Sequence, residues 1–506
     1  MVHHQRILLP QQKNKPDLEQ SPGSFKLHSL NQIMSYDYYL SIRNHRSNTG
    51  FLRLLLLFSL FSFILLFSPR LFFSSIYTLD NPTQEENWPA PCSDMPNNTI
   101  CCDRTAIRTD VCYMRGDVRT NSNSNSLFLV SSNSSNIEEK IRPYTRKWET
   151  SVMSTIDELH LKTVKPESMP SQKCDVVHNV PAVVFSTGGY TGNVYHEFND
   201  GIIPLYITSQ KFNGEVVFVM LEYHDWWMTK YGYAISHLSN HPAIDFSNDK
   251  RTHCFSEVIV GLKIHDELAI DPAKMDDHKT IRDFRNFLDE AYKPRIRGII
   301  KEETEKPSKA QKTQIKASNT RNQLSLERPK LVILSRNGSR KIENEGRLVK
   351  VAKEVGFNVQ ILRPKRSTEL EKIYMHMNSS DVMVGVHGAA MTHFLFMRPG
   401  SVFIQVVPLG TDWAAETYYG EPAVKLGLRY INYKLLPRES SLYEEYKKDD
   451  PVLRDPDSIN AKGWQYTKKV YLDGQNVKLD LVRFRKRLIR AYQYTLRKRQ
   501  QENMIN

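Results

Sequence analysis

The stretch Val382–Pro408, VMVGVHGAAMTHFLFMRPGSVFIQVVP, decides the fold of the second half of the chain. Its first apolar run, Val382–Val386, is typical of a buried parallel strand. The run ends at the letters HGAA (387–390), where small residues allow a tight turn into a short amphipathic segment, and a second apolar run follows at 402–407. A helix that starts at such a turn offers free N–H groups to an anion. The stretch therefore predicts either an anion-binding loop or an ordinary, tightly packed strand–turn–helix.

Short apolar runs alternate with helical periodicity on both sides of this stretch. In the second half we predict strands at 331–335, 358–362, 382–386, 401–407 and 429–436, with helices at about 343–355, 367–378 and 413–426. In the first half we predict strands at 127–130, 182–186, 215–221 and 257–261 and a helix at 282–300. Alternation of this kind predicts a parallel, doubly wound sheet. The expected architecture is an α/β fold with two Rossmann-like domains facing a cleft, where ligands of such sheets bind.

A uniformly apolar segment near the N-terminus predicts a membrane anchor. Leu54–Pro69 contains no charged residue, and Arg70 follows it. This core is short for a span of roughly 20 residues, but arginines at its two ends can reach the interface. Arg43, Arg46 and Arg53 precede the segment, and by the positive-inside rule they place the N-terminus in the cytoplasm. We predict a single-pass type II protein, because a cleaved signal peptide would begin nearer residue 1.

The cysteines agree with an oxidising compartment. All six follow the predicted anchor: Cys92, Cys101, Cys102, Cys112, Cys174 and Cys254. An even number in an oxidising lumen predicts disulfides. Clustering favours pairing within the first four, with different partners for Cys101 and Cys102, and a separate bridge between Cys174 and Cys254. A zinc site is the alternative, but the C-x₂-C spacing that it needs is absent.

Composition shifts divide the chain into segments. We predict a cytoplasmic tail (1–50), a transmembrane signal anchor (51–73), a lumenal stem (74–125), an N-terminal α/β domain on the acceptor side (126–300), a basic linker (301–329), a C-terminal Rossmann-like domain (330–475) and a basic C-terminal helix (476–506). Four sequences for N-linked glycosylation begin at Asn97, Asn133, Asn337 and Asn378.

Charge and missing motifs exclude several classes of protein. The formal net charge of +13 would suit a nucleic acid or a membrane surface, but most of the chain is predicted to be lumenal, so no nucleic-acid partner is expected. No G-x-x-x-x-G-K-[ST] sequence is present, which disfavours a P-loop phosphotransferase. No G-x-G-x-x-G follows a predicted strand, which disfavours an oxidoreductase that uses a dinucleotide.

Two loops at the carboxyl edge of the second predicted sheet offer positive groups. Arg336 and Arg340 follow its first strand, and guanidinium groups form paired hydrogen bonds with a diphosphate. His387, Gly388 and Ala389 follow its third strand, and backbone N–H groups there would add fixed dipoles. The alternatives are an exposed arginine pair and a histidine whose hydrogen bonds are satisfied in the core.

The first half concentrates titratable groups in GNVYHEFND (192–200), directly after a glycine-rich loop. A reaction that activates a hydroxyl group needs one general base, and His196, Glu197 and Asp200 are candidates. On a helix, His196 and Asp200 share a face while Glu197 is rotated away. That spacing favours a histidine base oriented by an aspartate. The alternative is a cluster of caps and ion pairs at a helix start.

Three ordered motifs carry a family resemblance: GNVYHEFND (192–200), LVILSRNGSRKIENE (331–345) and the stretch 382–408. Together they resemble plant glycosyltransferase family 61 over residues 170–440. The segment CCDRTAIRTDVCYMRGDVRT (101–120) and the anchor are similar to the xylan-modifying branch of that family. The resemblance implies two Rossmann-like domains of the GT-B type, a location in the Golgi membrane and inverting transfer from a UDP-sugar. It implies no cofactor and no essential metal.

The resemblance also implies partners and contacts. The donor would be a UDP-pentose, the acceptor xylan, and the transferred sugar arabinofuranose or xylose. A complex with other Golgi transferases is a further candidate. Arg336, His387 and Gly388 would contact the donor, and Glu416 would accept hydrogen bonds from its ribose. Candidate surfaces for stacking on acceptor sugars are Tyr190, Tyr195, Trp226 and Trp227.

A metal-dependent transferase would often carry Asp-x-Asp at a strand end. The sequence has one such triplet, Asp455-Pro456-Asp457, in a late loop where solvation is the simpler interpretation. We therefore expect arginines and backbone dipoles to balance the charge of the leaving group. Two alternative functions stay open: a transferase that moves xylose or N-acetylglucosamine to glycoprotein glycans, and a non-catalytic Golgi scaffold that retains the fold.

Overall fold

The computed structural model describes residues 92, 95–132, 136–168, 173–305 and 328–505. One compact unit, Asn87–Ile459 with Tyr466–Asn506, holds both sheets. The other unit comprises Met1–Glu86, outside the described residues, and Asn460–Gln465. Within the described ranges, no helix is both long and apolar enough to cross a bilayer. The predicted tail (1–50) and anchor (51–73) lie outside these ranges, as does the sequon at Asn133.

The second half contains a five-stranded parallel sheet in the order β12-β11-β13-β14-β15. Its strands are β11 (Lys330–Leu334), β12 (Asn358–Leu362), β13 (Val382–Val386), β14 (Val402–Val407) and β15 (Arg429–Lys434). The central strands β13 and β14 are buried throughout, whereas the edge strands β12 and β15 are partly exposed. This pattern follows the sequence, because an apolar run needs cover on both faces. The predicted order of strands and helices is confirmed here.

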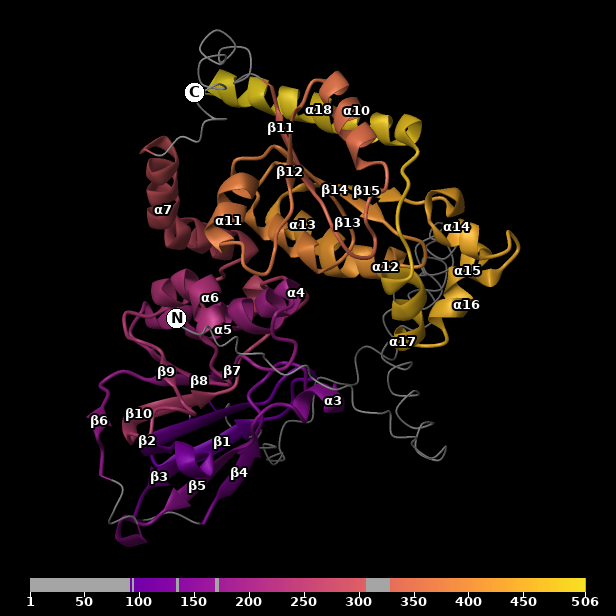
Figure 1. The fold of residues 1–506 in the computed structure, drawn as a ribbon. Helices are drawn as coiled ribbons and strands as arrows, with labels where there is room; N and C mark the ends of the chain where they lie inside the picture. The colour runs from indigo at the N-terminus through magenta and orange to yellow at the C-terminus, as the bar shows by residue number, and fades with distance from the viewer. Residues whose placement is uncertain (1–91, 93–94, 133–135, 169–172, 306–327, 506) are drawn as a thin grey trace, which may run out of the picture. The chain divides into compact units, whose positions relative to one another are not determined.

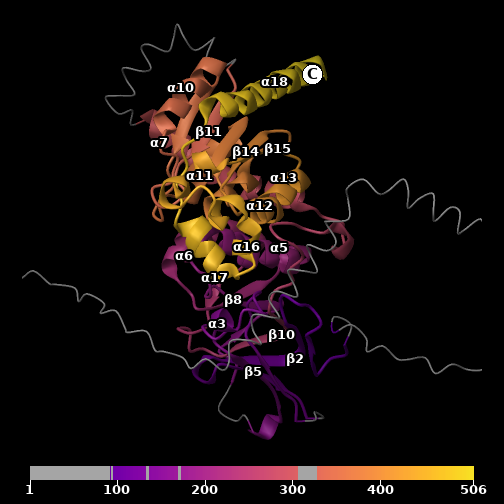
Figure 2. The ribbon, with the colours of Figure 1, turned by 90° about the vertical axis from the view of Figure 1, so that its right-hand side faces the viewer.

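Helices cover both faces of this sheet (Figures 1 and 2). On one face, α10 (Glu345–Val355) and α18 (Leu481–Ile505) pack over alternate strand residues. The other face is covered by α11 (Leu370–Asn378), η7 (Ala389–Phe396) and α13 (Glu421–Leu426). Both apolar faces are therefore buried, which fixes the register of the strands.

The first half contains a ten-stranded mixed sheet with the main order β4-β5-β3-β2-β10-β7-β8-β9. The parallel part consists of β10 (His253–Val260), β7 (Ala182–Ser186), β8 (Val217–Leu221) and β9 (Ile244–Asp245), with β6 (Val176–Val177) beside β10. The rest is an extension of β1 (Thr99–Asp103), β2 (Val111–Asn121), β3 (Ser126–Val130), β4 (Glu138–Ile141) and β5 (Leu159–Val164). Because β2 runs antiparallel to β10, the sheet is mixed and not wholly parallel as predicted.

The extension changes where the folded chain begins. Residues 99–121, predicted as part of the stem, form β1 and β2, and β2 lies between β3 and β10. The polar sequence NSNSNS (121–126) predicts a flexible stem. In the structure it forms the short connection η2 (Ser122–Ser124) between the paired strands β2 and β3. The strand before it, β2, has a short apolar run at 111–114 and then the irregular, mainly polar letters RGDVRTN, which weakens its sequence signal.

Further helices complete the described chain. The α-helices are α3 (Thr150–Met153), α4 (Val194–His196), α5 (Ile203–Ser209), α6 (Asp225–Leu238), α7 (Ile281–Glu305), α12 (Asp412–Ala415), α14 (Leu442–Glu445), α15 (Pro451–Arg454), α16 (Pro456–Asn460) and α17 (Trp464–Thr467). The π-helices are η4 (Glu197–Ile202), η8 (Glu416–Gly420) and η10 (Lys468–Asp473), and short 3₁₀ helices are η3 (Pro166–Ser168), η5 (Gln210–Phe212), η6 (Pro272–Lys274) and η9 (Pro437–Glu439). The first residues of the predicted linker, 301–305, belong to α7, and 306–327 lie outside the described residues. The predicted C-terminal helix is α18.

Three disulfides join the cysteines as the sequence predicted. Cys102 pairs with Cys112, and Cys174 pairs with Cys254. The third bridge joins Cys92 to Cys101, so the adjacent Cys101 and Cys102 have different partners. Within the first cluster of four cysteines, the sequence left the exact pairing open.

Candidate active site

Two arginines converge on the turn after β13. Gly388 has a φ of +141°, and a Cβ added there would lie 2.5 Å from Nη1 of Arg336 and 3.1 Å from Nη1 of Arg340. Only glycine allows this backbone conformation and this approach of the guanidinium groups. Arg340 itself has a φ of +60°, and its backbone N–H donates to the carbonyl of Gln475. The structure thus brings together residues predicted from two separate loops.

Neither arginine has a carboxylate partner among the described residues. Arg336 donates from Nε to the carbonyl of Ser339 at 3.2 Å, and Arg340 donates from Nη1 to the carbonyl of His387 at 3.3 Å. Burial lowers the pKa of both guanidinium groups, and the charge of Arg336 helps to lower that of Arg340 to about 10. Nε of Arg340 is buried without a hydrogen-bond partner. Arg340 is buried and Arg336 is half-buried, and the charge of Asp473 acts to raise the pKa of Arg340 without an ion pair between them. Two like charges with no carboxylate in direct contact form a site that favours an anion.

The segment after Gly388 differs from the predicted amphipathic helix. It is the 3₁₀ helix η7, and Met391–Phe396 are buried in full. The prediction was wrong because η7 packs into the core that both halves share, so that its residues after Ala390 have no polar face toward solvent. Ala389 is the first residue of η7 and is half-buried, directly after the turn at Gly388.

His387 is buried at the end of β13 and is held in one orientation. Its Nδ1 lies 3.0 Å from Nε2 of Gln405, and Oε1 of the same amide accepts from the hydroxyl of Tyr430 at 2.8 Å. This series of hydrogen bonds makes Nδ1 of His387 an acceptor, so Nε2 carries the proton. Burial, followed by the charges of Arg340 and Arg336, lowers the pKa of His387 to about 3. The ring is therefore neutral and offers one N–H donor.

Glu416 begins the π-helix η8 and is half-buried. Its carboxyl carbon lies 3.0 Å from the position of a Cβ added at Gly420, and its charge helps to raise the pKa of Tyr430. Tyr430 is the residue whose hydroxyl orients Gln405. Glu416 is thus connected to the His387 group through Tyr430.

In the first half, His196 and Asp200 form the predicted pair. Asn193 accepts from the N–H of Tyr195 and so caps α4, which places His196 at its end. The helix continues through the π-helix η4, and π-turns are frequent at functional sites. Nδ1 of His196 lies 2.6 Å from Oδ2 of Asp200, and no hydrogen bond within the described residues engages Nε2. One ring nitrogen is oriented by a carboxylate while the other is unpaired, as a general base requires.

Asp200 is buried and surrounded by donors. Oδ2 accepts from Nε of Arg146 at 2.8 Å, and Oδ1 accepts from Nδ2 of Asn199 at 2.7 Å. Burial raises the pKa of Asp200, but the charge of Arg146 and the hydrogen bond from His196 outweigh burial and lower it. The carboxylate is therefore ionised, which suits an orienting role.

Glu197 points elsewhere. One carboxylate oxygen accepts from Nε1 of Trp227 at 2.6 Å, and the other accepts from the backbone N–H of Gly192 at 2.5 Å. Burial raises the pKa of Glu197. These bonds fasten the glycine-rich loop to α6, so the geometry favours His196 over Glu197 as the base.

Arg146 is a site residue of the first half that the sequence motifs did not reveal. Besides Asp200, it contacts Glu149 at 3.0 Å and lies with Nη2 3.3 Å from Nδ1 of His196. Its guanidinium lies over the ring of Trp148 at 5.2 Å. No motif marks Arg146, because it lies about fifty positions before His196 in an irregular segment.

The aromatic candidates separate into exposed and buried side chains. Tyr190 is 37 % exposed and stacks on the ring of His196 with centroids 4.1 Å apart. Trp226 is 40 % exposed and can meet a ligand. Trp227 and Tyr195 are buried, so the prediction that they stack on a sugar was wrong for these two. They are core residues whose polar atoms bind Glu197 and Glu267.

Aromatic contacts connect the two clusters. The ring of Tyr195 lies 5.1 Å from that of His196 and 6.0 Å from that of Tyr419 on η8. Tyr419 in turn lies 5.3 Å from the ring of His387. The pair His196–Asp200 and the arginine cluster around Gly388 are therefore separated by two aromatic rings, so both belong to one region of the molecule.

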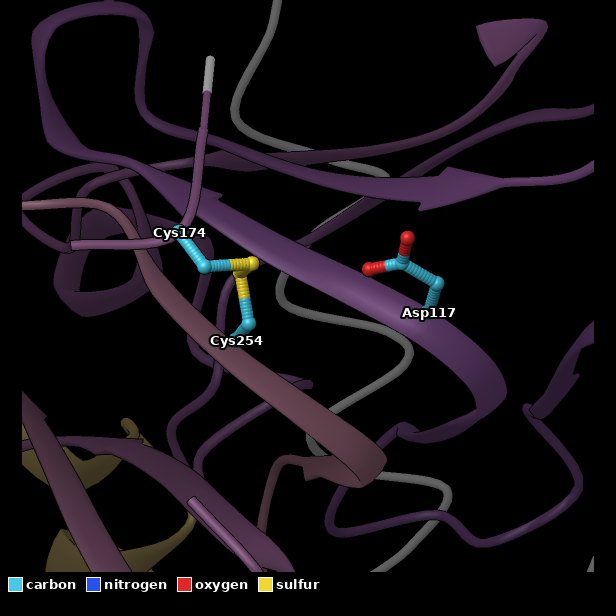
Figure 3. Close-up of side chains that lie close together, drawn as sticks. All are labelled: Asp117, Cys174 and Cys254. Carbon is cyan, nitrogen blue, oxygen red and sulfur yellow. A yellow bond between two sulfur atoms is a disulfide. The ribbon is translucent and has the colours of Figure 1, made fainter. Parts of the chain in front are cut away.

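One group of potential metal ligands stands apart from this region. It consists of Asp117, Cys174 and Cys254 (Figure 3). The two sulfur atoms are bonded to each other, so neither is a thiolate that could bind a metal. The triplet Asp455-Pro456-Asp457 has exposed carboxylates, and Oδ1 of Asp455 accepts from the N–H of Ser458 at the start of α16. It is a solvated helix start, as predicted.

Comparison with known proteins places this geometry in a family. A family model described as Glycosyltransferase 61 matches residues 252–404, which include the arginine cluster and η7. The chain is 56 % identical over 462 residues to the xylan glycosyltransferase MUCI21 of Arabidopsis thaliana, covering 88 % of this chain and 91 % of that protein. The chain belongs to glycosyltransferase family 61 and is a glycosyltransferase.

Two rice members of the family match over most of this chain. The alpha-1,3-arabinosyltransferase XAT3 of Oryza sativa subsp. japonica is 37 % identical over 393 residues, which cover 77 % of this chain and 64 % of that protein. The beta-1,2-xylosyltransferase XYXT1 of the same organism is 32 % identical over 483 residues, which cover 89 % and 98 %. The resemblance inferred from the three sequence motifs is thus confirmed.

Proposed function

We propose that the protein transfers a pentose, arabinofuranose or xylose, from a UDP-sugar to xylan with inversion at the anomeric carbon. The names of the relatives support the acceptor and the sugar class, since they are xylan glycosyl-, arabinosyl- and xylosyltransferases. The observation that carries the donor site is the convergence of Arg336 and Arg340 on Gly388 without a carboxylate partner. A diphosphate supplies the missing negative charge.

The donor site would use the groups at the carboxyl edge of the second sheet. Arg336 and Arg340 bind the diphosphate, and the turn at Gly388 and Ala389 lets it approach the backbone. His387 donates from Nε2, and Glu416 accepts from the ribose hydroxyls. Sites of this kind occur where open α/β sheets end. The two sheets and the contacts between their clusters support a GT-B arrangement with the donor on the second half.

The reaction needs one proton transfer and one displacement. Nε2 of His196 removes the proton of an acceptor hydroxyl, and that oxygen attacks the anomeric carbon of the donor. The bond from this carbon to the β-phosphate oxygen breaks, and UDP leaves with the electron pair. The new bond forms on the opposite face, which inverts the configuration. Asp200 holds the ring and stabilises the imidazolium that forms.

Charge on the departing UDP is balanced by the two arginines and the N–H of His387 in this proposal. Such preorganised groups stabilise charge strongly inside a protein. We therefore expect transfer to continue in the presence of EDTA. Loss of activity in EDTA that added Mn²⁺ or Mg²⁺ restores would contradict the metal-independent mechanism.

We also propose that the protein is a single-pass type II protein of the Golgi membrane. Three disulfides support a compartment that is oxidising, which the lumen of the secretory pathway provides. Protease protection of the C-terminal part in intact vesicles, followed by digestion after detergent, would test the topology. Digestion in intact vesicles would contradict it.

A donor screen with the full-length protein in detergent tests the function. UDP-arabinofuranose, UDP-xylose and UDP-N-acetylglucosamine are each offered with xylan oligomers and with glycopeptides. We expect transfer of one pentose to xylan oligomers, and an NMR coupling constant of the product reports inversion. Transfer to glycopeptides alone would favour the glycoprotein alternative.

His196→Ala separates an enzyme from a scaffold. The variant should lose transfer while UDP binding persists, because His196 lies outside the arginine cluster. His241→Ala, at a surface histidine paired with Glu215, is the matched control and should behave as the wild type. Normal transfer by His196→Ala would overturn the assignment of the base.

A further inference from the structure

A closed ring of contacts surrounds the Nδ1 side of His196. Asp200 binds Nδ1, Arg146 binds Asp200, and Glu149 binds Arg146 at 3.0 Å. The second carboxylate oxygen of Glu149 accepts from the hydroxyl of Tyr190 at 2.6 Å. Tyr190 completes the ring by stacking on His196 with an interplanar angle of 22°. Arg146 and Glu149 lie in one turn, Tyr190 lies in the loop before α4, and His196 and Asp200 lie on α4 and η4, so the ring holds the imidazole from two sides.

We propose that Arg146 is a positioning residue for the transfer reaction, holding the His196 ring through Asp200 and opposing protonation of that ring by its own charge. The inference rests on the proposed role of His196 as the base. It deepens that role, because it names the group that determines how the base behaves as the pH falls.

The geometry assigns two effects to Arg146. Its Nε–H occupies the same oxygen of Asp200 that His196 contacts, so Asp200 cannot rotate away from the ring. Its Nη2 lies 3.3 Å from Nδ1 of His196. Because the Nδ1–H of His196 already donates to Asp200, Arg146 does not form a hydrogen bond with this nitrogen and acts on the ring through its charge. A guanidinium at this distance disfavours an imidazolium, whereas Asp200 favours it. Arg146 therefore offsets part of the influence of Asp200.

Arg146 itself is firmly held. Burial lowers its pKa, but the charge of Asp200, the hydrogen bond to Asp200 and further charges nearby together raise it by more, so its pKa lies well above the usual value. Trp148 covers its guanidinium, and Arg108 lies over the same ring at 5.5 Å. In the described part of the chain, the charged or titratable groups that surround His196 are Asp200, Glu197, Arg146, Glu149, Tyr190 and Tyr195. Others act at one remove: Glu267 binds Tyr195, and Arg108 pairs with both Asp200 and Glu267.

Arg146→Gln tests the proposal by removing the charge and keeping a polar side chain. We expect kcat to fall by about 100-fold, because a small displacement of the base suffices for such a loss. The acid limb of the profile of kcat against pH should move to higher pH by about one unit. The Kd for UDP should stay within about twofold, because the donor cluster lies on the second half. Arg146→Lys should restore the wild-type limb and part of kcat.

Glu149→Gln provides an independent test with the opposite sign. It removes a negative charge beside Arg146 and leaves the Arg146–Asp200 bond in place, so the acid limb should move to lower pH. Arg104→Gln is the matched control: Arg104 pairs with Asp110 and Glu139 and contacts no member of the ring. Its kcat and pH profile should equal those of the wild type.

The outcomes distinguish this inference from the proposed function. If Arg146→Gln and Glu149→Gln both keep the acid limb of the wild type while His196→Ala is inactive, the proposed role of Arg146 is wrong. The assignment of His196 as the base is then unaffected. If His196→Ala retains transfer, the proposed base itself is wrong. If UDP affinity falls together with kcat in Arg146→Gln and Arg146→Lys restores neither, Arg146 is only a structural residue.

Discussion

The side-chain amide of Gln405 on β14 donates from Nε2 to Nδ1 of His387, the residue directly after the neighbouring strand β13, at 3.0 Å. The hydroxyl of Tyr430, on the next strand, fixes the orientation of that amide. Three strands thus cooperate to place one proton on Nε2 of His387. A histidine that was predicted from a motif is held in a defined tautomer by residues that no motif marks.

Gln405→Glu should reverse that tautomer. A carboxylate in place of the amide accepts a proton from Nδ1, so Nε2 loses its hydrogen and can no longer donate. We expect ¹⁵N chemical shifts of the ring to report the change and UDP affinity to fall by about tenfold. Tyr430→Phe, which keeps the amide, should have a smaller effect. An unchanged tautomer in Gln405→Glu would contradict the hydrogen-bond chain.

Arg336→Ala should lose UDP binding without losing stability. Hydrogen bonds to charged groups are worth about 1.5–3 kcal/mol, so the Kd should rise by about 100-fold. The Tm without UDP should not fall, because Arg336 makes one side-chain hydrogen bond and repels Arg340. Calorimetry and thermal melting measure both quantities. Arg347→Ala, at an exposed position on α10, is the control and should change neither. Wild-type affinity in Arg336→Ala would remove the donor site from this cluster.

The free energy of unfolding should decrease as the pH falls below about 6.5. His387 and His393 are buried and neutral, and burial lowers their pKa values to about 3 and about 4 from the ordinary 6.5. The unfolded chain therefore binds more protons than the folded chain between pH 4 and 6.5, and stability is lost with each step down in pH. Each group contributes a slope of up to about 1.4 kcal/mol per pH unit.

His393→Asn isolates one of these slopes. The amide of asparagine can replace the bond from Nδ1 of His393 to the carbonyl of Ala390, which is 2.7 Å long. Denaturant unfolding at several pH values should give a smaller slope for the variant than for the wild type below pH 6.5. Equal slopes would show that His393 is not kept neutral by burial.

Loss of the Cys174–Cys254 disulfide should cost more stability than loss of the Cys102–Cys112 disulfide. The first bridge spans 80 residues and the second spans 10. The entropy lost by the unfolded chain predicts about 4.5 kcal/mol for the longer loop and about 2.7 kcal/mol for the shorter one. Double Cys→Ser variants compared by denaturant unfolding measure the difference. A larger cost for the shorter loop would point to local strain or packing as the dominant effect.

The sequence predicted the second sheet in detail and the first sheet in part. Buried parallel strands such as β13 and β14 are almost wholly apolar, so their local sequence is enough to predict them. The antiparallel strand β2 begins with the apolar run 111–114, but charged residues and Gly116 interrupt the pattern after it, and its pairing with β10 joins segments about 140 residues apart. Local patterns contain no information on such a distant partner.

The same reasoning explains the site residues. Arg336, His387, Gly388, His196 and Asp200 stand in compact motifs whose spacing has a direct geometric meaning. Arg146, Gln405 and Tyr430 act through contacts between separate segments, and each stands among residues without a pattern. A side chain that orients another can be found only once the fold brings the segments together.

The position of β2 inside the first sheet bears on how the protein can be produced. A recombinant protein that begins at residue 126, where the sequence pattern places the start of the folded region, would lack β1 and β2. β10 and β3 would then each present an open edge, and unpaired edges promote association between molecules. A recombinant protein that is to be soluble and active should therefore begin before Cys92. A shorter version would keep all the active-site residues, and its aggregation would be due to the missing strand.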